Sequence, residues 1–67
     1  MDKFEETQKI VKELNNNIAE HKESIAKLKY DLESYNLSEE SIYAIGEQIS
    51  WYEHAIDYDI CLIAEIN

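Results

Sequence analysis

Apolar residues recur at alternating intervals of three and four along the first half of this 67-residue chain. On a helix this spacing places all of them in one stripe, as in the seam of a coiled coil. The series consists of Phe4, Thr7, Val11, Leu14, Ile18, His21, Ile25, Leu28, Leu32 and Tyr35. We therefore predict one long amphipathic helix near residues 3–35.

The second half of the chain contains a similar but less regular series. Its members are Ile42, Ile45, Ile49, Tyr52, Ile56, Asp59, Ile63 and Ile66. Asp59 interrupts the apolar stripe. Because an ideal helix drifts by about 20° per heptad relative to such a seam, we expect Ile60 to take the place of Asp59. The pattern predicts a second helix near residues 39–66.

A short connection lies between the two predicted helices. Asn36 tolerates the left-handed conformation that ends many helices. Ser38 is a favourable N-cap, and Glu39 and Glu40 follow in the first turn, where the helix dipole favours acids. Helices joined by so short a turn pack as antiparallel neighbours. We therefore predict an all-α protein, an antiparallel, coiled-coil-like two-helix hairpin that forms one domain over residues 1–67.

The second predicted helix carries a further apolar stripe beside its seam. The stripe consists of Ala44, Trp51, Ala55, Tyr58 and Leu62. Two stripes on one helix require two neighbours, and an exposed aromatic stripe promotes association. We expect two hairpins to dimerise into a four-helix bundle, with Trp51, Ala55, Tyr58 and Leu62 at the oligomer interface. A hairpin completed by a different protein would bury the same residues and is the alternative.

Charge is distributed unevenly along the chain. The net charge is −9, yet all six lysines lie in residues 1–29, where six acids balance them. Residues 30–67 contain nine acids and no Lys or Arg. A surface of this kind repels nucleic acid and anionic membranes and attracts basic proteins. We therefore predict no direct binding to nucleic acid or to membranes.

Acidic residues and a tyrosine are predicted to share the solvent side of the second helix. We assign partner binding to this acidic face, which consists of Glu40, Tyr43, Glu47, Glu53 and Asp57. The predicted function is a non-enzymatic inhibitor, of a size that suits a phage-encoded protein. It would dock on the basic, nucleic-acid-binding surface of a partner, with carboxylates in place of phosphates. The alternative is a structural adaptor or oligomerisation module that uses the apolar stripe, its acidity serving solubility.

The sequence offers little material for chemistry. Glu53, His54 and Asp57 are only three possible metal ligands on neighbouring faces, and we predict neither a metal nor another cofactor. Cys61 has no histidine plausibly near it, which argues against nucleophilic catalysis. We interpret His21 as a polar layer opposite Tyr52 that fixes the register of the helices, rather than as a base or a pH switch. No enzymatic activity is predicted.

Features of the whole chain indicate its compartment. The N-terminus is charged from Asp2 onward, and no apolar run approaches the length of a membrane span, so we expect neither a signal peptide nor a transmembrane helix. Cys61 is the only cysteine and cannot form an intrachain disulfide. A cytoplasmic location is expected.

Overall fold

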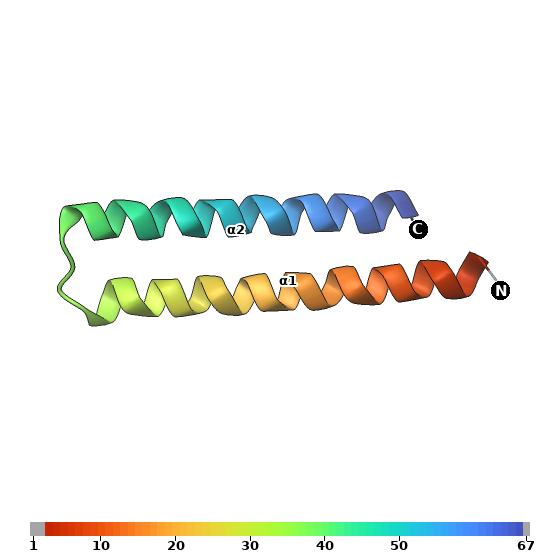
Figure 1. Ribbon diagram of the computed structural model, residues 1–67, viewed down its shortest axis with the longest axis horizontal. Coiled ribbons are helices and arrows are strands. Elements are labelled where there is room, and N and C mark those ends of the chain that lie inside the picture. The colour runs from red at the N-terminus through yellow and green to blue at the C-terminus, as the bar shows by residue number, and fades with distance from the viewer. Residues whose placement is uncertain (1–2, 67) are drawn as a thin grey trace.

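The protein is an antiparallel hairpin of two long helices in this computed structural model, which describes residues 3–66. Helix α1 spans Lys3–Ser34 and helix α2 spans Glu39–Ile66. The two helices lie side by side, with the turn at one end and both termini at the other (Figure 1). The Cα atoms extend over 53 × 16 × 13 Å. The predicted all-α hairpin is therefore confirmed, and α1 ends one residue before its predicted boundary.

Helix α1 ends in a different way from that predicted. The Tyr35 N–H donates a hydrogen bond to the Asp31 carbonyl oxygen at 3.2 Å, which continues the helical bonding by one residue. No non-glycine residue in the described part of the chain has a positive φ. The left-handed conformation expected at Asn36 is therefore wrong. After that last helical bond, the chain leaves through the irregular segment 36–38 and needs no left-handed cap.

Ser38 caps the start of α2, as its position predicted. The Ser41 N–H donates to the Ser38 Oγ at 3.2 Å, and the Ile42 N–H donates to the Ser38 carbonyl oxygen at 3.0 Å. This is the geometry of an N-cap residue, whose side chain satisfies one of the free N–H groups of the first turn. Such a cap contributes about 1 kcal/mol to helix stability. The local sequence thus fixes where α2 begins.

The two predicted seams form the contact between the helices. Ile18 and Ile56 are the two residues of the described chain that are buried, each 8% exposed. Around them lies a row of half-buried residues from both helices, comprising Thr7, Val11, Leu14, His21, Ile25, Leu28 and Leu32 in α1 and Ile45, Ile49, Tyr52, Asp59, Ile63 and Ile66 in α2. The end members of the seams stay exposed: Phe4 by 65%, Tyr35 by 62% and Ile42 by 48%. A narrow seam is therefore the whole core of the described part of the chain.

The seam of α2 keeps its heptad register through Asp59. Asp59 is half-buried in the seam, whereas Ile60 is 50% exposed. The prediction that Ile60 replaces Asp59 is therefore wrong. Ile56 and Ile63 flank Asp59 in the same row, and their packing against α1 holds the helix in a strict seven-residue repeat. The drift of an ideal, unpaired helix is consequently not expressed.

Gly46 lies in open space in α2. A Cβ added at this position would meet no atom within 4 Å. Close approach between the two helices of the hairpin therefore does not account for the glycine.

Candidate interaction faces

The apolar stripe on α2 lies at the edge of the seam and is open to solvent along its outer part. Trp51 is 63% exposed and Tyr58 is 65% exposed. Ala55 and Leu62 of the same stripe are half-buried. The four residues recur at intervals of three and four, so that they form one continuous strip along α2. We call the side of the hairpin that carries this strip the association face.

Helix α1 contributes a second row to the association face. Ile10, Asn17 and Ser24 recur every seven residues and therefore share one line along α1. A shallow groove between the helices is lined by Ser24, Lys27, Leu28 and Asp31 from α1 and by Gln48 and Tyr52 from α2, so that Ser24 lies on the same side of the hairpin as Gln48. Ile10 is 45% exposed. Sequence reasoning missed this row because Ile10 is its one apolar member and lies outside the predicted seam.

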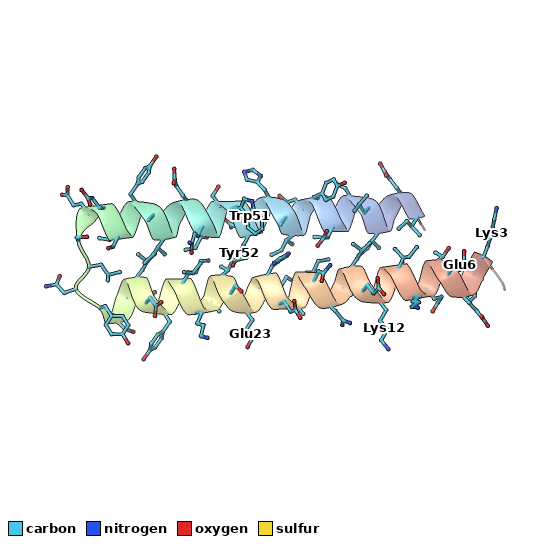
Figure 2. The ribbon with its side chains drawn as sticks, viewed as in Figure 1. Lys3, Glu6, Lys12, Glu23, Trp51 and Tyr52 are labelled. Carbon is cyan, nitrogen blue, oxygen red and sulfur yellow. The ribbon has the colours of Figure 1, made fainter. Side chains whose placement is uncertain are left out.

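Three aromatic rings connect the association face to the seam. The His21 ring lies 5.4 Å from Tyr52 and 6.2 Å from Trp51, measured between ring centroids. The Trp51 and Tyr52 rings are 5.1 Å apart and nearly perpendicular, at 76°. Figure 2 shows Tyr52 in the space between the helices and Trp51 against α2. The predicted apposition of His21 and Tyr52 is confirmed.

This cluster has a consequence for Trp51. Ring pairs at such distances contribute about 0.5–1.5 kcal/mol each beyond the area that they bury. Two rings therefore hold Trp51 in place, while most of its surface remains in contact with water. A large aromatic side chain that is both held in place and exposed has the properties of an anchor residue at a protein interface.

The hairpin as a whole exposes much more surface than a globular protein of its mass. Its accessible area is 5568 Å². A folded monomer of 7.9 kDa is expected to expose about 4,400 Å². The difference of about 1,200 Å² reflects the elongated shape and the absence of a second layer over the seam.

All five residues assigned to the acidic face are exposed, and Tyr43 is 69% exposed. The face is nevertheless divided. Glu53 and Asp57 line a groove between the helices together with Lys22 and Lys29 of α1. These lysines reduce the negative potential around the two carboxylates. Sequence reasoning missed this proximity of lysines and carboxylates because the lysines lie on the other helix, 24 or more positions away along the chain.

Glu40, Tyr43 and Glu47 lie nearer the turn, outside this groove, on a helix that has no Lys or Arg of its own. Helix α1 differs, since lysines and acids alternate on its outer side. Lys12 and Glu23 both lie on the side of α1 turned away from α2 (Figure 2).

Within residues 3–66, no group of three or more His, Cys, Asp or Glu side chains is arranged to hold a metal ion. Cys61 is a free, exposed thiol. Neither of the two helices is long and apolar enough to cross a membrane.

Comparisons with protein families, with curated proteins and with solved structures found no match.

Proposed function

We propose that this chain is a non-enzymatic assembly module, two copies of which pair through their association faces into a four-helix bundle. The observation that supports this proposal is the exposure of Trp51 and Tyr58 beside a seam in which only Ile18 and Ile56 are buried within the described chain. A small domain with so little core needs another source of stability, and oligomerisation is a common one.

The available area fits a dimer. A specific protein interface of standard size buries about 800 Å² on each partner. The chain exposes about 1,200 Å² more than a globular monomer of its mass, by comparison of 5568 Å² with about 4,400 Å². Burial of the association face against a second copy would therefore bring each chain close to the exposure of an ordinary globular protein.

Thermal unfolding at different protein concentrations tests this proposal. If folding and association are coupled, the midpoint should rise by roughly 5–10 °C over a hundredfold increase in concentration, since mass action favours the paired state. Circular dichroism at 222 nm follows the loss of helix. A midpoint that is independent of concentration would contradict the proposal, because a hairpin that folds alone unfolds in a unimolecular reaction.

A second candidate function is inhibition by docking on a basic, nucleic-acid-binding protein. The observation that favours it is the exposed group Glu40, Tyr43 and Glu47 in a half of the chain that has no Lys or Arg. Carboxylates on this face would occupy the cation sites that otherwise bind phosphates. This surface lies outside the association face, so a dimer would present it twice.

Capture experiments test the second candidate. We expect the tagged chain to retain a DNA- or RNA-binding protein from a cell lysate at about 50 mM salt, and to release it at about 500 mM salt or on addition of DNA. The double variant Glu40→Lys/Glu47→Lys should fail to retain that protein. Glu5→Lys/Glu23→Lys changes the charge equally on the outer side of α1 and should retain it. Equal retention by both variants, or retention that resists salt, would contradict docking through the acidic face.

A further inference from the structure

We propose that the two hairpins of the dimer lie with their turns at the same end, so that α1 of each copy packs on α2 of the other. This inference rests on the proposed dimer. Two hairpins that meet face to face with two-fold symmetry have two arrangements. A two-fold axis along the helices gives the same-end arrangement. An axis across the helices puts the turns at opposite ends, with α1 on α1 and α2 on α2.

Helix direction does not distinguish these arrangements. In both of them every pair of adjacent helices is antiparallel, so the helix dipoles are equally well placed. The choice therefore depends on the charges and on the side chains of the two helices.

Charge favours the same-end arrangement. Helix α2 has no basic residue and carries seven acids, namely Glu39, Glu40, Glu47, Glu53, Asp57, Asp59 and Glu65. Helix α1 has six lysines and seven acids, so that its net charge is 6 − 7 = −1. The opposite-end arrangement would place two helices of charge −7 side by side at about 8–10 Å, a separation comparable to the Debye length of about 8–10 Å at ordinary ionic strength. The same-end arrangement puts them on the longer diagonal and gives each α2 two lysine-bearing neighbours.

Side-chain size favours the same arrangement. The association face of α2 presents the bulky Trp51 and Tyr58, whereas the row on α1 includes the small Asn17 and Ser24. The contact between the His21 and Trp51 rings places Trp51 level with His21, between Asn17 and Ser24 along the helix axis. An axis along the helices preserves this level. Trp51 of one copy then meets Asn17 and Ser24 of the partner subunit, large against small.

The opposite-end arrangement pairs the rows differently. It sets Trp51 and Tyr58 against the association face of α2 in the other copy, and Asn17 and Ser24 against the row on α1 in the other copy. The first contact would be crowded and the second underfilled, and both conditions cost stability in a close-packed interface.

Spin labels in the turn distinguish the two arrangements. The chain is labelled at Asn36→Cys in a Cys61→Ser background. Asn36 is exposed, lies outside both helices and has no positive φ, so that a labelled cysteine fits there. Double electron–electron resonance should give a distance between the two labels of roughly 30 Å or less, because neighbouring helices are about 8–10 Å apart. A distance near the 53 Å length of the hairpin would overturn the same-end arrangement.

A second label separates failure of this inference from failure of the dimer. Glu23→Cys in the same background lies on the outer side of α1, near the middle of the hairpin, where both arrangements give a similar, measurable distance. A dipolar signal from this site, together with a long distance between the two labels in the turns, would overturn the same-end arrangement but would still support the dimer. Absence of an intermolecular signal from both sites would overturn the dimer, and the inference with it.

Discussion

Truncation of Ile56 to alanine should lower the free energy of unfolding by about 2–3 kcal/mol, the low end of the range for a buried isoleucine. Ile56 is one of two buried residues in the described chain, the other being Ile18 in the seam of α1. A domain of this size has only a few kcal/mol of stability in total, so this loss is a large part of it. Urea unfolding followed by circular dichroism at 222 nm, at one fixed chain concentration, measures the effect.

Ile60→Ala is the matched control for this experiment. It makes the same chemical change in the same helix, one turn away, at a side chain that is 50% exposed. We expect it to change the free energy of unfolding by less than about 0.5 kcal/mol. If both variants lowered the free energy of unfolding equally, Ile60 would be as buried as Ile56. The assignment of Asp59 rather than Ile60 to the seam of α2 would then be wrong.

Replacement of Tyr58 by glutamate should weaken self-association about a hundredfold or more. The change puts a carboxylate into the centre of an apolar contact, where an unpaired charge costs about 3 kcal/mol or more. Tyr58 is preferable to Trp51 for this test, because the Trp51 ring also contacts His21 and Tyr52 within the chain. Sedimentation equilibrium gives the dissociation constant of the dimer directly.

Tyr43→Glu controls for the change in charge and in helix propensity. Tyr43 lies on the same helix with nearly the same exposure, 69% against 65% for Tyr58, but on the acidic face. Its dissociation constant should stay within about threefold of the original, a difference of about 0.7 kcal/mol. Equal weakening by both variants would show that net charge alone controls association. Absence of an effect in both variants would remove the association face from the interface.

The sequence predicts the hairpin well because its signals are local and agree with one another. The seam residues from Thr7 to Leu32 recur without a break, and Ser38 carries the chemistry of an N-cap. Two local predictions were wrong for a physical reason. Asn36 needed no left-handed conformation, because the helical bonding of α1 extends to the N–H of Tyr35. Ile60 did not enter the seam, because packing across the helices overrides the drift of a single helix.

The candidate faces were less predictable, since they depend on which side chains of one helix meet those of the other. The stripe through Trp51 and Tyr58 is visible in one helix alone and could be read from its spacing. The row that begins at Ile10 belongs to α1, and its member Ser24 shares a groove with Gln48 and Tyr52 of α2 only in the hairpin. The lysines beside Glu53 and Asp57 are equally invisible to a count of charges along the chain.

Pairing of two hairpins through the association face is the central claim, and the molar mass of the particle in solution tests it most directly. Size-exclusion chromatography with multi-angle light scattering should give twice the 7.9 kDa mass of the chain. High salt should preserve or favour this dimer, because salt screens the repulsion between two chains of net charge −9. A mass of 7.9 kDa at the highest concentration that can be loaded, from a sample that circular dichroism shows to be helical, would contradict the claim.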